Sequence, residues 1–161
     1  MIENASVLFN RITHGVYVIA VSNGTEQNAF TAAWVMQVSF DPPMIAFSIN
    51  PEHYSYKLLQ ASGVCTVNVL GQDHLAIAAH FGQPGVKEKM ATYRWQAGKT
   101  AAPVLSDCLA YFDCKLSHTT DAGDHKIAVC EVIAAAELNS GWPLLYSQTG
   151  NMDGSGELYK G

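Results

Sequence analysis

Residues 28 to 50 read NAFTAAWVMQVSFDPPMIAFSIN, and the other predicted elements are arranged around this segment. An apolar run rich in β-branched and aromatic residues leads to Asp41-Pro42-Pro43, and a second run, from Met44 to Ile49, follows it. This pattern predicts two strands joined by a tight bend. Hydroxyl and amide side chains lie among the apolar ones, at Asn28, Thr31, Gln37, Ser39, Ser48 and Asn50. Because a buried polar group without a partner costs about 1–3 kcal/mol, these side chains need backbone partners or a flat polar ligand.

The rest of the chain predicts a mainly β fold with short helices. We expect further strands at 16–21, 64–70, 109–117, 127–136 and 142–146, with a hairpin at 119–124 between the two longest. Helices are expected at 5–13, from residues 53–55 to Gly63, and at 73–81 with Asp73 as N-cap. Glycine and proline interrupt residues 82–107, which predicts a loop or lid. Residues 1–146 are expected to form a single domain and 147–161 a flexible tail.

The composition indicates a chain that buries part of its surface against a partner. The 161 residues fit one domain. Hydrophobic residues make up 48% of the chain and charged residues only 14%, which is low for a globular protein. A homodimer is the simplest arrangement that would cover such a surface. The net charge of −5, with no cluster of Lys and Arg, argues against a nucleic acid or an anionic membrane as partner.

The N-terminus and the cysteines indicate a cytoplasmic protein. Residues 1–4 lack the basic and apolar regions of a signal peptide, and no apolar run approaches the ~20 residues of a membrane span. The cysteines, Cys65, Cys108, Cys114 and Cys130, form no C-x-x-C pair. Buried reduced thiols are therefore favoured over zinc ligands or disulfides. The histidines and carboxylates have no spacing typical of a metal site, so we expect none.

Four motifs resemble the flavin reductase-like family of FMN-binding split β-barrels. They are Asn28–Trp34 with Val38–Ile45, then Ser62–Leu70, then Ala122–Ile127 with its Gly-Asp-His, and finally Pro143–Tyr146. They occur in the order typical of the family and span roughly residues 8–150. The resemblance implies a Greek-key-like closed barrel, bound FMN, NADH or NADPH as electron donor, and a homodimer with each flavin near the subunit interface.

The resemblance places the FMN phosphate at the helix that begins near Tyr54. Free backbone N–H groups and the positive end of the helix dipole favour an anion there. The side chains assigned to the phosphate region are His53, Ser55, Lys57, Lys87 and Lys89. Taken without the resemblance, the local sequence favours Ser55 as a helix cap and the lysines as solvated surface residues.

The resemblance also implies contacts to the isoalloxazine ring and the ribityl chain. Small residues in the central segment allow backbone groups to approach the polar pyrimidine edge of a flavin. The residues assigned to this part of the site are Asn28, Thr31, Ala32, Val38, Ser39, Ser48 and Asn50. The alternative is that Thr31 and Ser39 are ordinary strand residues. Trp34 and Phe40 are expected to lie in the core.

His125 is the candidate catalytic residue. A histidine after Gly123-Asp124 in a hairpin turn is commonly a solvated side chain. In the family that the motif resembles, this histidine projects toward the flavin and the incoming nicotinamide. Hydride transfer needs no strong acid, so His125 is expected to position groups or balance charge.

Together, these expectations predict that the protein is an NAD(P)H:flavin oxidoreductase, which transfers hydride from a nicotinamide to flavin N5. The reduced flavin would serve free flavin, a ferric complex or a partner oxygenase. Two alternatives are a non-enzymatic FMN carrier or electron-transfer protein, and a barrel that has lost flavin. The sequence departs from the family pattern at Cys130, where relatives commonly have Gly, and after Tyr146, where Asn151–Gly154 replaces the usual aromatic residues.

Overall fold

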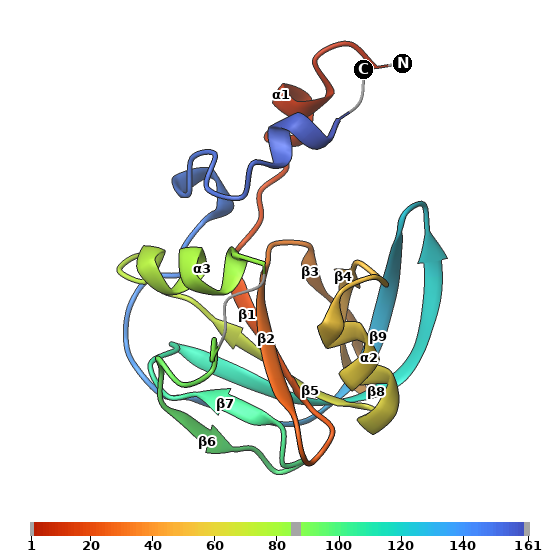
Figure 1. Cartoon of the computed structure of the whole chain (residues 1–161), viewed down its shortest axis with the longest axis vertical. Helices are drawn as coiled ribbons and strands as arrows, with labels where there is room; N and C mark the ends of the chain where they lie inside the picture. Colours follow the sequence, from red (N-terminus) through yellow and green to blue (C-terminus); the bar gives the residue numbers. More distant parts are fainter. Residues whose placement is uncertain (1, 85–87, 160–161) are drawn as a thin grey trace.

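The fold is built on one antiparallel sheet of seven strands, seen in Figure 1. The computed structural model describes residues 2–84 and 88–159. The strand order is β2-β1-β5-β8-β9-β4-β3. The strands are β1 (Tyr17–Ser22), β2 (Gln27–Ala32), β3 (Val35–Phe40), β4 (Pro43–Ile49), β5 (Val64–Val69), β8 (Ala110–Ala122) and β9 (His125–Glu137). The predicted mainly β class is confirmed.

The central segment forms three strands, where we expected two. β2 pairs with β1, whereas β3 pairs with β4, so the chain passes from one end of the sheet to the other at Ala33-Trp34. The predicted bend at Asp41-Pro42-Pro43 is confirmed as the β3–β4 turn. The expected closure of the barrel is not observed. Among the described residues, β2 and β3 occupy the two ends of the strand order and do not pair with each other.

Both faces of the sheet are covered. Because successive strand residues point to opposite faces, Ile19 and Val21 of β1 belong to one buried cluster, and Val18 and Ala20 to another. The first cluster is completed by α2 (Tyr54–Ser62) and the second by α3 (Leu75–Gly82). In Figure 1, α2 lies on the right and α3 on the left. The presence of β1 residues in both buried clusters confirms the expectation that this strand is apolar on both faces.

All four cysteines are free and buried, as predicted. The thiols of Cys65 and Cys130 lie 4.0 Å apart. Contacts with the thiols of Cys114 and Cys130, together with burial, raise the pKa of Cys65 well above its ordinary value. Cys65 therefore fills the core as a neutral thiol.

The helices begin close to the predicted positions, with two corrections. α1 (Ala5–Phe9) ends before the expected Thr13. Bonds from the N–H groups of Arg11 and Ile12 to carbonyls three residues earlier follow it. The N-cap of α3 is His74, so the prediction of Asp73 as cap is wrong. No described helix has the length and apolar character needed to cross a bilayer.

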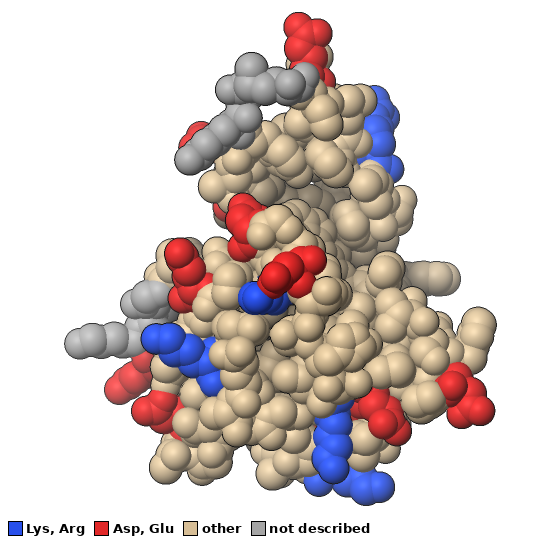
Figure 2. All heavy atoms as spheres, turned by 90° about the vertical axis from the view of Figure 1, so that its right-hand side faces the viewer, with Lys and Arg blue, Asp and Glu red and all other residues tan. Residues whose placement is uncertain are grey.

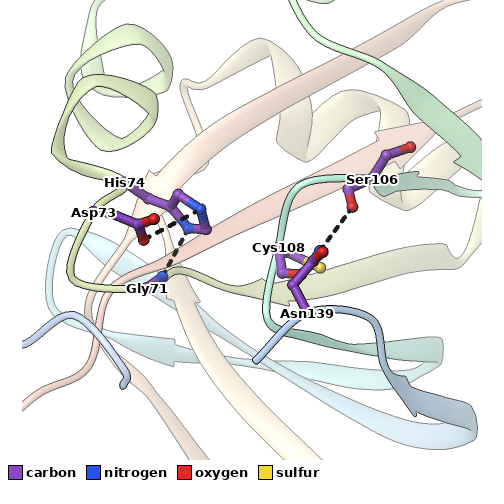
Figure 3. A network of polar contacts seen from close by, with 6 residues as sticks. All are labelled: Gly71, Asp73, His74, Ser106, Cys108 and Asn139. Carbon is purple, nitrogen blue, oxygen red and sulfur yellow. Dashed lines mark hydrogen bonds and ion pairs between the residues drawn. The ribbon is translucent and has the colours of Figure 1, made fainter. Parts of the chain in front are cut away.

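The start of α3 is held by the polar contacts shown in Figure 3. His74 Nδ1 accepts from the Gly71 N–H at 2.8 Å, and Asp73 lies beside the other imidazole nitrogen at 3.5 Å. Nearby, the amide of Asn139 donates to the carbonyls of Ser106 and Cys108. Burial raises the pKa of the Cys108 thiol to about 12, so this group carries no thiolate near neutral pH. The network is structural.

The prediction of a loop or lid over residues 82–107 is wrong for its second half. This part contains the hairpin of β6 (Trp95–Ala97) and β7 (Pro103–Leu105), and β7 is fully buried. Buried polar side chains of the large sheet hold the hairpin. Asn68 Oδ1 accepts from the Leu105 N–H at 2.9 Å, and Asp113 Oδ2 accepts from the Thr100 N–H at 2.9 Å.

The C-terminal part departs from the expected pattern. β8 and β9 run to the turn at Gly123-Asp124, so most of the expected hairpin at 119–124 is strand. Their tip projects on the right of Figure 1. Residues 142–146 form only single bridges, Gly71 with Pro143 and Gly15 with Leu145, so the predicted last strand is wrong. The 3-10 helices η1 (Tyr146–Gln148) and η2 (Ser155–Leu158) follow, and the tail lies beside α1 at the top of Figure 1.

Candidate functional site

The candidate site lies beside β2, the strand at one end of the sheet. Two polar contacts fix β2 between the helices. Asn28 Nδ2 donates to Ser55 Oγ of α2 at 3.0 Å, and Thr31 Oγ1 donates to the carbonyl of Ala78 in α3 at 2.7 Å. β2 pairs only with β1 among the described strands, so its other edge offers backbone N–H and C=O groups.

The N-terminus of α2 faces this strand. The helix begins after His53, the N-cap residue, as predicted. The imidazole of His53 packs edge-on against Phe30 of β2, with ring centroids 5.6 Å apart. The turn before it is held by Asn50, whose Oδ1 accepts from the Glu52 N–H at 2.9 Å. His53 makes no side-chain cap bond, and the Tyr56 N–H donates to the His53 carbonyl at 3.0 Å. Among the described residues, the N–H groups of Tyr54 and Ser55 are therefore available to an anion.

Two other basic side chains act electrostatically on His53 at this helix end. Burial lowers the pKa of His53, and the charges of Lys89 and His125 lower it further. Burial also lowers the pKa of Lys89, whose Nζ lies 6.0 Å from the ring centroid of Phe81. We call His53, Lys89 and His125 the basic cluster. Because the charges of Lys89 and His125 disfavour the charged form of His53, the cluster is suited to an anionic ligand.

His125 reaches the cluster through the register of the sheet. Lys126 pairs with Ile49 at the end of β4, so His125 lies beside the turn that leads into α2. Its imidazole contacts the edge of the Trp34 indole, with ring centroids 5.3 Å apart at 61°. Its Nδ1 lies 2.7 Å from Asp124 Oδ1, and the hydrogen bond to His125 lowers the pKa of Asp124.

Trp34 was expected in the core, and this prediction is wrong. Its side chain is 49% exposed, because residues 33–34 cross between the two ends of the sheet. The carbonyl of Trp34 accepts from the Ser48 N–H at 3.0 Å, which ties the crossing to β4. No motif in the sequence signals that the ring contacts His125.

A mostly apolar cavity of about 320 Å³ lies beside Trp34. Its walls come from the segment before β1, the start of β3, the middle of β4 and the start of β9. They comprise Ile12, Thr13, His14, Trp34, Val35, Met36, Ala46, Phe47, Ser48 and Ile127. Ser48, assigned to the site from sequence, is therefore accessible on this face.

The other residues that were assigned to the site from the sequence lie in different parts of the fold. Ala32 is buried, so its side chain is part of the core. Val38 and Ser39 lie near the β3–β4 turn, at the far end of that hairpin from Trp34 and Ser48. Lys57 is exposed on α2, and Lys87 lies outside the described residues. Phe40 was also expected in the core, and this is wrong because it is 91% exposed on β3.

Comparison with known proteins agrees with this geometry. The model of the flavin reductase like domain matches residues 9–155. FMN reductase (NADH) RutF of Variovorax paradoxus (strain S110) is 34% identical over 137 residues, covering 84% of this chain and 76% of that protein.

Two solved structures have the same fold. NADH:FAD oxidoreductase SgcE6 of Streptomyces globisporus C-1027 superposes with a TM-score of 0.82 at 27% identity, covering 92% of this chain and 93% of that chain. BorF, the flavin reductase component of a bacterial two-component tryptophan halogenase, gives a TM-score of 0.80 at 29% identity, with coverages of 88% and 91%. This chain belongs to the flavin reductase like domain family.

Proposed function

We propose that this protein is an NAD(P)H:flavin oxidoreductase that binds FMN between β2, the N-terminus of α2 and the β8–β9 hairpin. The observation that carries the proposal is the N-terminus of α2 beside β2, where His53 makes no side-chain cap bond and the charges of Lys89 and His125 act on it. A dianionic phosphate suits this cluster and the uncapped helix end. The NADH-dependent activities named for RutF and SgcE6 support a nicotinamide donor.

The chain's own groups would bind and orient the flavin. The open edge of β2 offers directional backbone partners to the pyrimidine ring, while Asn28 and Thr31 hold this strand against the helices. Bound FMN supplies the hydride acceptor, its N5 atom. His125 and Trp34 lie where they can position the ring and the incoming nicotinamide.

The finer features of the fold belong to the same proposal. The seven strands form the split-barrel arrangement, with the split between β2 and β3 accommodating the cofactor. The protein acts in the cytoplasm as a homodimer. A self-complementary interface is supported by exposed apolar side chains on α1 and β3, namely Val7, Leu8, Phe9, Met36, Val38 and Phe40. Figure 2 shows the side of the molecule that lies on the right of Figure 1, where areas without charged side chains separate the charged ones.

The reduced flavin must pass its electrons to an acceptor. Because BorF is the reductase component of a two-component halogenase, a flavin-using partner enzyme is a reasonable acceptor here. Free flavin is the simplest assay substrate for this role.

A titration tests the first step of the proposal. Purified protein is mixed with FMN, and the flavin fluorescence is followed as a function of protein concentration. We expect saturable binding, with one FMN per chain. A protein that remains colourless and does not bind FMN would contradict the proposed function.

A further inference from the structure

Asp124 and His125 are hydrogen-bonded to each other at the turn between β8 and β9. Asp124 Oδ1 lies 2.7 Å from His125 Nδ1, a short contact for a nitrogen–oxygen hydrogen bond. Hydrogen bonding to His125 lowers the pKa of the Asp124 carboxyl, so the group is ionised near neutral pH. An ionised carboxylate can only accept hydrogen bonds. Nδ1 must therefore carry the proton of this bond.

The second nitrogen of His125 has a different environment. Among residues 2–84 and 88–159, Nε2 of His125 has no hydrogen-bond partner. The side chain of His125 is only 25% exposed, whereas that of Asp124 is 95% exposed. The solvent-facing carboxylate thus engages Nδ1, while the ring itself is largely covered by the protein.

Two further contacts restrict the ring. The indole of Trp34 packs edge-on against the imidazole, and Trp34 is itself fixed to β4 through the bond from the Ser48 N–H. The strand register also brings the hairpin near α2, because Lys126 pairs with Ile49 at the end of β4. Asp124 and Trp34 together leave little freedom for the ring to flip.

We propose that Asp124 is a positioning residue, which holds His125 in the Nδ1–H form and leaves Nε2 as the nitrogen that meets the ligand. This inference rests on the proposed function, because it assigns the ligand to the flavin or the nicotinamide at the basic cluster. Neutral His125 then offers an acceptor to a ligand N–H group, and protonated His125 offers a donor to an anionic ligand atom. Asp124 itself need not touch either ligand.

The hairpin contains a matched control for this pair. Asp121 is also an exposed carboxylate, and it pairs with Lys126 within the same turn region. Exposed ion pairs contribute little to stability. Neither Asp124→Ala nor Asp121→Ala is therefore expected to unfold the hairpin.

The first test needs no turnover. Long-range ¹H–¹⁵N correlation spectra of the FMN-free protein at about pH 8, where an ordinary histidine is neutral, report which imidazole nitrogen carries the proton. His125→Ala identifies the signals. We expect the Nδ1–H form in the wild type and in Asp121→Ala, with the Nε2–H form gaining population in Asp124→Ala. An Nε2–H form in the wild type, or an unchanged spectrum in Asp124→Ala, would overturn the proposal.

The second test separates orientation from binding. In Asp124→Ala we expect flavin reduction by NADH to slow between about 10- and 100-fold, the range for a misplaced group, while FMN affinity stays within about twofold of the wild type. Asp121→Ala should keep the wild-type rate. Equal slowing in both variants would mean that the hairpin, and not the imidazole, is responsible. A wild-type protein that reduces no flavin would refute the proposed function and leave the tautomer result standing.

Discussion

Asn28 Nδ2 donates to Ser55 Oγ at 3.0 Å, which joins β2 to the first turn of α2 across 27 positions of sequence. Ser55 is fully buried. Its hydroxyl links the strand to the helix, and it lies next to the proposed phosphate site. The geometry of the proposed flavin site therefore depends on this contact.

The first prediction concerns this link. Ser55→Ala leaves the Asn28 amide without its partner, and we expect the free energy of unfolding to fall by about 1–3 kcal/mol. Urea unfolding of the FMN-free protein measures this change. Ser117→Ala, at an exposed position on β8, serves as control. An unchanged unfolding midpoint in Ser55→Ala would show that the bond does not stabilise the fold.

His125→Ala is expected to preserve FMN binding but slow flavin reduction. The side chain lies beside Trp34 at the hairpin tip, where it affects the geometry of reaction more than the affinity for the phosphate. Fluorescence titration measures binding, and rapid-mixing absorbance measures reduction. Loss of FMN with a normal rate in the saturated protein would refute this placement.

Lys89→Ala is expected to have the opposite effect. Removing a cation from the basic cluster should weaken FMN binding by about 1–3 kcal/mol, the scale of a hydrogen bond to a charged group, with little change in the reduction rate at saturation. Lys99→Ala, an exposed lysine between β6 and β7, is the control. If Lys89→Ala binds FMN normally while His125→Ala does not, the flavin lies in the reverse orientation.

The stability of the FMN-free protein should depend on pH through His53. Burial and the charges of Lys89 and His125 lower its pKa from 6.5, so the unfolded chain binds the proton more tightly. The contribution of His53 is therefore present above pH 6.5 and is lost as the pH falls through the lower folded pKa. Because His53 is partly exposed, solvent screening keeps the effect small. Urea midpoints between about pH 8 and pH 5 should fall less steeply in His53→Gln, and identical slopes would contradict the assignment.

The proposed dimer predicts a mass near twice 17.4 kDa by light scattering. Phe40→Asp places a charge in the exposed apolar stripe of β3 and should shift the protein toward the monomer mass. Thr120→Asp, on the exposed part of β8, should not. A wild-type protein that scatters as a monomer at micromolar concentration would remove the dimer from the account.

Local signals in the sequence were sufficient for several elements. The bend at Asp41-Pro42-Pro43 and the start of α2 after His53 follow from residues that lie within a few positions of each feature. The resemblance to the family also directed attention to His125 and Lys89, and the charges of both lower the pKa of His53.

Features that depend on distant partners could not be predicted in this way. Trp34 and Phe40 look like core residues because they are large and apolar, yet their exposure is decided by which strands pair with β2 and β3. The β6–β7 hairpin was missed because glycine and proline interrupt its pattern. Its burial depends on Asn68 and Asp113, which belong to other strands.

The most direct test of the central claim is anaerobic rapid mixing of FMN-loaded protein with NADH or NADPH, followed at the visible absorbance of the flavin. The account predicts bleaching with at least one donor, and slower bleaching when the transferred hydrogen at nicotinamide C4 is deuterium, since that hydrogen passes directly to flavin N5. FMN that is bound but stays oxidised with both donors would contradict an NAD(P)H:flavin oxidoreductase and would indicate a flavin carrier.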